Sequence, residues 1–271
     1  MIERAQDHVW MTARVLEQRR FAFLFGDGDA APVAAALRPY ETADGGYGYA
    51  LEPDGRGPTS QPPHIWTALE VLEEIGATDP RIGDHLTALG DGVPLALPAR
   101  ERQAPWWSGD GPSLIATALL CTRLGYAHPW RDRAAAFCWD AIERIETTHP
   151  YEVEAAIAFL DWADDRPRAE REAERLGALV RAQGLIGAQP EGYAVNEIHH
   201  PHDYAKHPDS LARRWFSDAE LEASLDGLEG QQREDGGWPV TWAIWTPAIE
   251  IEWSGLVTIA ALKILRAYGR V

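Results

Sequence analysis

The segment EPDGRG carries two acids beside an arginine, at Glu52, Asp54 and Arg56. An arginine neighbour keeps one of two adjacent carboxylates ionised, which leaves the other free to hold a proton. Such a group can start an acid-catalysed reaction, so Asp54 and Glu52 are candidate catalytic residues. The structural alternative is an ordinary Asp-Gly turn with an ion pair at the surface.

A second pair of acids, Glu250 and Glu252, opens the last long apolar segment of the chain. Acids at the start of a helix also complement its dipole, which is the structural alternative here. As catalytic residues, Glu250 and Glu252 are the candidates for the second carboxylate of a pair.

Aromatic residues gather near these acids, since many of the 12 tryptophans lie beside Gly, Pro and acidic residues. Each aromatic face can stabilise a positive charge by roughly 0.5–2 kcal/mol. We therefore expect a pocket walled by aromatics with carboxylates set into it, while packing between helices is the alternative for any single tryptophan. The loop APWWSGDG, which contains Trp106 and Trp107, also contains a carboxylate, Asp110. The expected substrate-binding residues are Tyr49, Arg56, His64, Trp66, Trp106, Trp107, Tyr151, Glu152, His199, His202, Trp242, Trp245 and Trp253.

The segment HHPHDYAKH, 199–207, has the residue types of a metal site. Its prolines indicate an irregular loop, and no H-E-x-x-H pattern occurs in the chain. We therefore predict no metal and no cofactor, and acid–base or hydrogen-bonding use of one histidine is the competing role. If a metal did bind, its ligands would be His199 and His202 with Asp203 or His207.

Charge and composition exclude several classes of partner. The formal net charge of −17 disfavours nucleic acid and anionic membranes, because phosphate binding needs Lys and Arg. No apolar run approaches the roughly 18 residues of a membrane span. The start MIERAQDHVW does not resemble a signal peptide. Cys121 and Cys138 lie in apolar helical patterns, so we expect reduced, buried thiols and a cytoplasmic protein.

Apolar residues recur at helical spacing along most of the chain, and no long segment has the period of a strand. Helices with small residues in their first half are expected at 63–75, 113–125, 152–163 and 251–269. More polar helices are expected at about 80–90, 131–146, 167–182 and 217–230. The remaining helices are expected at 2–25 and 30–38, with a weaker one near 209–216.

Alternation of two kinds of helix, with a period of about 40–50 residues, predicts a repeat of helical hairpins. The predicted fold class is all-α. Small residues suit a closely packed inner ring, and polar helices suit an outer ring. We expect an α/α toroid of about five to six inner and outer helix pairs, with an open solenoid as the main alternative. One domain would cover residues 1–271.

The segment QQREDGGWPV carries Gln232, Gly236 and Trp238 in the spacing Q-x-x-x-G-x-W. This motif resembles the one repeated in squalene-hopene cyclases and oxidosqualene cyclases, whose superfamily includes the protein prenyltransferase β-subunits. Looser copies consist of Glu41, Gly45 and Tyr47, and of Gln183 and Gly187.

In that superfamily the motif ties outer helices together, so the resemblance implies structural roles for Gln232 and Trp238. Other signatures are missing: the chain has no D-x-D-D acid motif, no D-x-C zinc motif and no Asp-rich magnesium motif. In the nearest sequence, DWADD, we expect Asp164 and Asp165 to form a helix cap and a solvated charge. The resemblance therefore implies a fold, and a fold does not fix a function.

These observations favour a small-molecule enzyme that performs acid-catalysed cyclisation or isomerisation of an apolar or terpenoid-like substrate in an aromatic cavity. One alternative is a carbohydrate-active enzyme that resembles inverting glycoside hydrolases, with Asp54 facing Glu250 or Glu252. Another is a non-catalytic toroid that binds a ligand or a protein. A homodimer or a partner protein stays open, because related cyclases often place the active site between two helical domains.

Overall fold

The computed structural model describes residues 1–98, 103–107 and 111–271. Over these residues the chain forms twelve α-helices and two 3₁₀ helices, and only isolated β-bridges instead of strands. The all-α prediction is therefore confirmed. None of the helices in these ranges is both long enough and apolar enough to span a bilayer.

The chain divides into two compact units. The terminal unit combines Met1–Phe21 with Glu146–Val271, and the middle unit is Ala22–Ile145. Helix α2 (Val15–Phe25) runs across the boundary between them. The prediction of a single domain stays a prediction.

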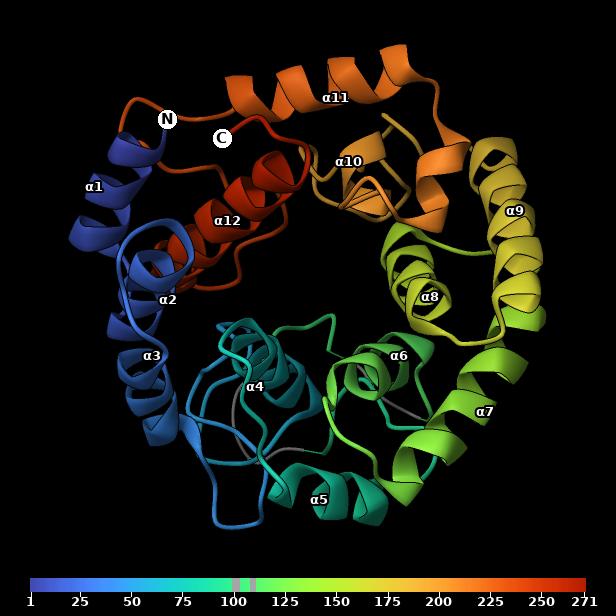
Figure 1. Ribbon diagram of the computed structural model, residues 1–271, viewed down its shortest axis with the longest axis horizontal. Helices are drawn as coiled ribbons and strands as arrows, with labels where there is room; N and C mark the ends of the chain where they lie inside the picture. Colours follow the sequence, from blue (N-terminus) through green and yellow to red (C-terminus); the bar gives the residue numbers. More distant parts are fainter. Residues whose placement is uncertain (99–102, 108–110) are drawn as a thin grey trace. The chain divides into compact units, whose positions relative to one another are not determined.

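In the middle unit, α4 packs against α6 and α6 against α7, while α5 also packs on α7 (Figure 1). Ala68, Ala116 and Ala118 are fully buried in α4 and α6, and these small side chains let the two helices approach closely. Ser113 caps α6 by accepting a hydrogen bond from the Ala116 amide. The helices of this unit are α3 (Ala30–Leu37), η1 (Arg38–Tyr40), α4 (Pro62–Glu74), α5 (Arg81–Leu89), α6 (Leu114–Arg123) and α7 (Pro129–Glu143).

In the terminal unit, α12 packs against α1 and α11, and α8 packs against α9 and α10 (Figure 1). Asp165 caps α9 by accepting from the Arg168 amide, as predicted from the sequence. The helices here are α1 (Ile2–Thr12), α8 (Pro150–Trp162), α9 (Arg166–Ala182), α10 (Pro201–Tyr204), η2 (Leu211–Trp215), α11 (Asp218–Gly230) and α12 (Pro247–Ala267).

Two predicted elements differ from the structure. The single helix expected at 2–25 is wrong, because Ala13 is extended and separates α1 from α2. The Gln18 amide donates to the carbonyls of Trp10 and Ala13, which satisfies acceptors at the end of α1. The weak helix near 209–216 is a short 3₁₀ helix, η2, and the helical turn α10 was not predicted.

The turn at 232–238 fastens α1 to the end of α11. Gly236 has a φ of +90°, and its amide donates to the Arg233 carbonyl. The Gln232 amide donates to the carbonyls of Met1 and Gly236, while Arg4 donates to Gln232 Oε1 at 2.6 Å. Trp238 is buried and donates from Nε1 to the Leu228 carbonyl. The contacts of Gln232 and Trp238 therefore join this turn to α1 and to α11.

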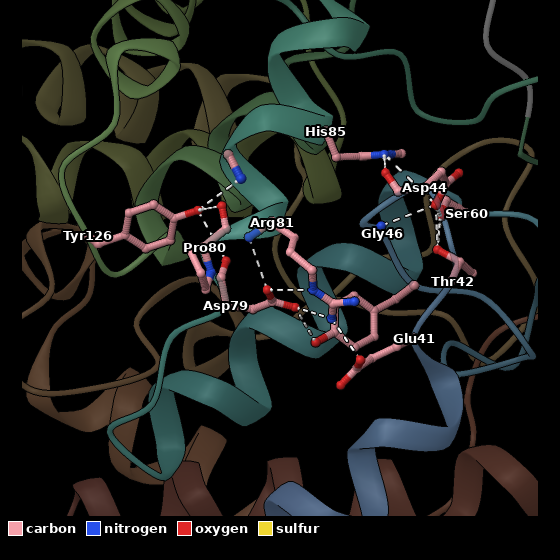
Figure 2. A network of polar contacts seen from close by, with 12 residues as sticks. Glu41, Thr42, Asp44, Gly46, Ser60, Asp79, Pro80, Arg81, His85 and Tyr126 are labelled. Carbon is pink, nitrogen blue, oxygen red and sulfur yellow. Dashed lines mark hydrogen bonds and ion pairs between the residues drawn. The ribbon is translucent and has the colours of Figure 1, made fainter.

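The turn at 41–47 repeats this arrangement in the middle unit, where it meets α5 (Figure 2). Its backbone bonds, from Gly45 to the Thr42 carbonyl and from Thr42 to the Gly46 carbonyl, match those from Gly236 to Arg233 and from Arg233 to Gly237. Arg81 forms an ion pair with Glu41 at 2.8 Å, as Arg4 bonds Gln232.

Each turn also receives a histidine four residues after that arginine. A Cβ added to Gly237 would lie 2.4 Å from His8 Nε2, and one added to Gly46 would lie 3.2 Å from His85 Nε2. In both turns a glycine lies against an imidazole ring, and at Gly46 the side chain of Ser60 lies closer still, 2.4 Å from the added Cβ. The loose copy that the sequence suggested at Glu41 is thus the same structural device as the copy at Gln232.

Gly236→Ala should destabilise the protein by about 2–3 kcal/mol, within the upper range for single substitutions. The positive φ disfavours any side chain, and the new Cβ would lie 2.0 Å from the Arg4 carbonyl oxygen. Urea unfolding measures the change. As a control, Gly227→Ala in α11 meets no atom within 4 Å and should stabilise by about 0.5–1 kcal/mol. Equal stability of Gly236→Ala and the wild type would contradict the contact.

Candidate active site

One group of ionisable side chains in the terminal unit is centred on Glu154, in the first half of α8. His199 donates from Nδ1 to Glu154 Oε1 at 2.7 Å, and Lys206 donates from Nζ to Glu154 Oε2 at 2.8 Å. His199 is 6% exposed. Its Nε2 has no hydrogen-bond partner among the described residues. It is also not one of their fully buried polar atoms that lack a partner. One nitrogen of the imidazole is thus anchored by the Glu154 carboxylate, and the other has no hydrogen bond to a described residue.

Two tyrosines border this group, each bonded to an ionisable partner. Tyr151 donates from its hydroxyl to Glu197 Oε1 at 2.6 Å. The Tyr193 hydroxyl lies 3.0 Å from His149 Nδ1 and shares a hydrogen bond with it. The Tyr151 ring stands perpendicular to His199 with centroids 4.8 Å apart and stacks on Tyr193 at 5.9 Å. The tyrosines thus join both histidines and both carboxylates into one cluster.

Helix α8 supplies one side of the cluster. Pro150 occupies the first turn, where its missing amide proton costs nothing, and His149 precedes it at the N-cap position. Tyr151 and Glu154 are three residues apart, so they share one face of the helix. The first turn of α8 thereby presents a phenol and a carboxylate together.

The segment before α10 supplies the other side, and the third copy of the glutamine motif holds it in place. The Gly187 amide donates to the His199 carbonyl at 2.8 Å, and Gly187 has a φ of +67°. Gln183 accepts from the Thr148 amide at 3.3 Å, just before α8. This copy has lost its aromatic residue, and it contacts the backbone on both sides of the cluster.

The two histidines of the cluster have pKa values that are shifted in opposite directions. Burial opposes charge on Glu154, but the Lys206 ammonium and the His199 hydrogen bond lower the pKa of that carboxyl to about 2. Burial also opposes charge on His199, yet its bond to Glu154 raises the pKa of the imidazole. Burial lowers the pKa of His149, against the opposing charge of Glu152. His199 therefore favours the proton-loaded form and His149 the neutral form.

The lowered pKa of Glu154 also links this cluster to folding. A carboxyl whose pKa is lower in the folded state stabilises the protein above its ordinary pKa of 4.5. That contribution is lost as the pH falls from 4.5 toward about 2. Burial raises the pKa of Tyr193 to about 12 and that of Tyr151 further still, so both phenols are neutral at physiological pH.

This arrangement can transfer protons. A carboxylate that holds the Nδ1 proton of a histidine fixes the orientation of the ring and stabilises its cationic form, which leaves Nε2 to exchange a proton with a substrate. Neighbouring groups with oppositely shifted pKa values are the usual sign of paired acid and base roles.

Of the predicted site residues, Tyr151 and His199 lie in this cluster, and Glu152 borders it by accepting from the Thr148 hydroxyl at 2.8 Å. His199 and His202, which the sequence offered as ligands only if a metal bound, lie in different surroundings. His202 is buried and its Nδ1 bonds Ser224 of α11 at 2.6 Å, so the two histidines have different partners. In the described residues, no group of three or more His, Cys, Asp or Glu side chains is arranged to hold a metal ion.

The predicted carboxylates Glu52 and Asp54 form a separate site in the middle unit. Glu52 Oε2 accepts from the Asp54 amide at 2.9 Å, and Trp106 donates from Nε1 to Asp54 Oδ2 at 3.2 Å. His64 Nδ1 accepts from the Glu52 amide, and its ring meets Trp107 edge-on at 5.8 Å. The structure thus brings five of the predicted residues together.

The remaining predicted residues of the middle unit differ in their exposure. Arg56 and Trp66 are half-buried, and Tyr49 is exposed with a φ of 58°. Asp110 lies outside the described residues.

The predicted acids at the start of α12 belong to the terminal unit. Glu250 is exposed, and Glu252 and Trp245 are half-buried. Trp242 and Trp253 meet edge-to-face with centroids 4.8 Å apart. The pairing of Glu250 or Glu252 with Asp54 stays a prediction.

Five residues of the Glu154 cluster are not among the predicted site residues: His149, Glu154, Tyr193, Glu197 and Lys206. Two signals were available. Tyr151 and Glu154 have the spacing of one helix face, and Lys206 is one of only two lysines in the chain. Tyr193 and Glu197 lie in an irregular loop, where spacing says nothing about geometry.

No protein-family model, curated protein or solved structure matches this chain. Its function therefore has to be argued from the chemistry of its own residues.

In an NMR titration, His199 should have a pKa above 6.5 and His149 a pKa below 6.5. Glu154→Gln should lower the pKa of His199, because it removes the negative charge bonded to Nδ1. Glu152→Gln is the matched control, and it should lower the pKa of His149 while changing His199 little. A His199 that titrates below 6.5 in the wild type would contradict this description.

Proposed function

We propose that this protein is an enzyme that isomerises a small molecule by proton transfer, with His199 as the general acid and Glu154 as the residue that orients and charges it. The observation that carries the proposal is the 2.7 Å bond between His199 Nδ1 and Glu154, which leaves Nε2 open. Lys206 holds the other oxygen of Glu154 and so fixes the carboxylate on both sides.

The strength of this acid limits which substrates His199 can protonate. An imidazolium with a raised pKa is a weak acid, and proton transfer is efficient only when the acid and its acceptor are matched in strength. Protonating an alkene needs a far stronger acid. His199 therefore fits a substrate that develops negative charge on oxygen, such as a carbonyl compound that passes through an enol.

A second candidate is acid-catalysed cyclisation at Asp54, supported by the indole of Trp106 that donates to this carboxylate. Asp54 is 3% exposed, and Glu52 lies beside it and accepts from its amide. The aromatic rings of Trp106 and Trp107 would stabilise developing positive charge. This candidate keeps the apolar, terpenoid-like substrate that the sequence favours.

We further infer that the helices form an α/α toroid of the terpenoid cyclase and prenyltransferase type. The support is the repeated turn, whose copies at 41–47 and 232–238 share their backbone bonds, their arginine and their histidine. Small-angle scattering should give the profile of a closed ring of helices. A profile that fits only an open superhelix would overturn the toroid.

Binding of 4-nitrophenolate, which mimics an enolate oxygen, should test the proposed acid. His199→Gln should weaken binding by about 10–100-fold, since a hydrogen bond to a charged group contributes about 1.5–3 kcal/mol. The phenolate absorption band reports the dissociation constant. His207→Gln removes an exposed histidine of the same unit and is the control.

Turnover of a panel of small carbonyl compounds, followed by NMR, should fall by about 10²–10⁴-fold in His199→Gln. Unchanged turnover in both His199→Gln and Glu154→Gln would refute the proposed site. Turnover that falls only in Asp54→Asn would transfer the function to the second candidate. If His199→Gln, Glu154→Gln and Asp54→Asn each bind ligands as well as the wild type does, the protein is a binding module.

A further inference from the structure

An isomerisation by proton transfer needs a base as well as an acid, because a proton leaves one atom of the substrate as another arrives. The Glu154 cluster contains a second carboxylate, Glu197, which is 8% exposed. Its Oε2 accepts from the Ala194 amide at 3.1 Å, and its Oε1 accepts from the Tyr151 hydroxyl at 2.6 Å. The backbone holds one oxygen, and the phenol covers the other.

We propose that Tyr151 and Glu197 form a proton relay that acts as the base of this site, and that the substrate is an uncharged, planar carbonyl compound with an acidic C–H bond. The inference rests on the proposed function, because His199 supplies the opposing acid.

The positions of the two groups dictate a relay. Glu197 is buried, whereas Tyr151 is 36% exposed and bonded to it. The phenol hydroxyl covers Glu197 Oε1, so a proton that reaches this carboxylate oxygen along the bond comes from Tyr151. The same Tyr151 ring stands perpendicular to His199 at 4.8 Å between centroids. Acid and relay thus border the same small region of the terminal unit.

The proton balance of the step is complete without an oxidant or a cofactor. The Tyr151 oxygen takes a proton from the substrate carbon while its own proton passes to Glu197 Oε1. The electron pair of the broken C–H bond forms the C=C bond of an enol, and the carbonyl oxygen takes the proton of His199 Nε2. Reversal of both transfers at a different carbon gives the isomer and restores Tyr151, Glu197 and His199.

Charge and shape indicate the class of substrate. Both cations of the cluster, Lys206 and protonated His199, are bonded to Glu154, and Glu197, Glu152 and Asp203 add negative charge around them, so the cluster has no excess positive charge for an anionic substrate to neutralise. The stacked rings of Tyr151 and Tyr193 are within 15° of parallel. Such a pair presents flat apolar surface, which suits a planar molecule.

Exchange of the C1 protons of 2-tetralone in D₂O, followed by proton NMR, tests the relay. The wild type should accelerate exchange, and Tyr151→Phe and Glu197→Gln should each reduce the enzymatic rate by about 10²-fold or more. Tyr151→Phe keeps the stacked ring, and circular dichroism checks that both variants fold. Tyr268→Phe removes a phenol that bonds the Ala205 carbonyl of the same unit, and it should leave the rate unchanged.

The outcomes separate the relay from the proposed function. If 4-nitrophenolate binding depends on His199 but exchange is unaffected by Tyr151→Phe and Glu197→Gln, the relay is wrong and the acid stands. If the wild type binds 4-nitrophenolate through His199 and exchanges no tetralone protons, the assigned substrate class is overturned. If binding does not depend on His199, the proposed function itself fails. Loss of exchange in both relay variants, with Tyr268→Phe unaffected, supports the relay.

Discussion

The paired contact of Glu154 with His199 and Lys206 is the interaction on which the candidate site depends. A carboxylate with little exposure costs several kcal/mol unless cations and donors compensate it, and here both of its oxygens have such partners. The same contact explains the orientation of His199, the raised pKa of its ring and the open Nε2. Tyr151 and Glu197 extend this charge-balanced group by one more hydrogen bond.

Sequence reasoning predicted the helices well because their signals are local. Buried positions such as Ile65, Leu69 and Leu72 repeat along one face of α4, and the proline and glycine at its ends mark the boundaries. The break between α1 and α2 could not be predicted locally, since the residue at the break, Ala13, packs against Gly255 in a distant helix. A Cβ at Gly255 would lie 2.6 Å from the Ala13 side chain, so its absence makes room for the extended residue.

The candidate site was harder to predict because its members come together only through tertiary packing. Asp54 and Glu52 were found because they are neighbours in the chain. Glu154 and His199 are 45 residues apart, and nothing in their spacing indicates the bond between them. The glutamine motifs carry a related lesson. The copies at 41–47 and 232–238 each place a glycine against a histidine ring. The copy at Gln183 and Gly187 instead forms hydrogen bonds with the backbone of Thr148 and His199.

The docking of α1 on the turn at 232–238 affects how the chain can fold during synthesis. Residues of the middle unit are continuous in sequence, so this unit can form once residue 145 has left the ribosome. Helix α1 is made before the middle unit, but the partners of Arg4 and His8 are Gln232 and Ser254, which are made more than 200 residues later. The apolar face of α1 therefore lacks these packing partners until the turn at 232–238 and α12 have been synthesised.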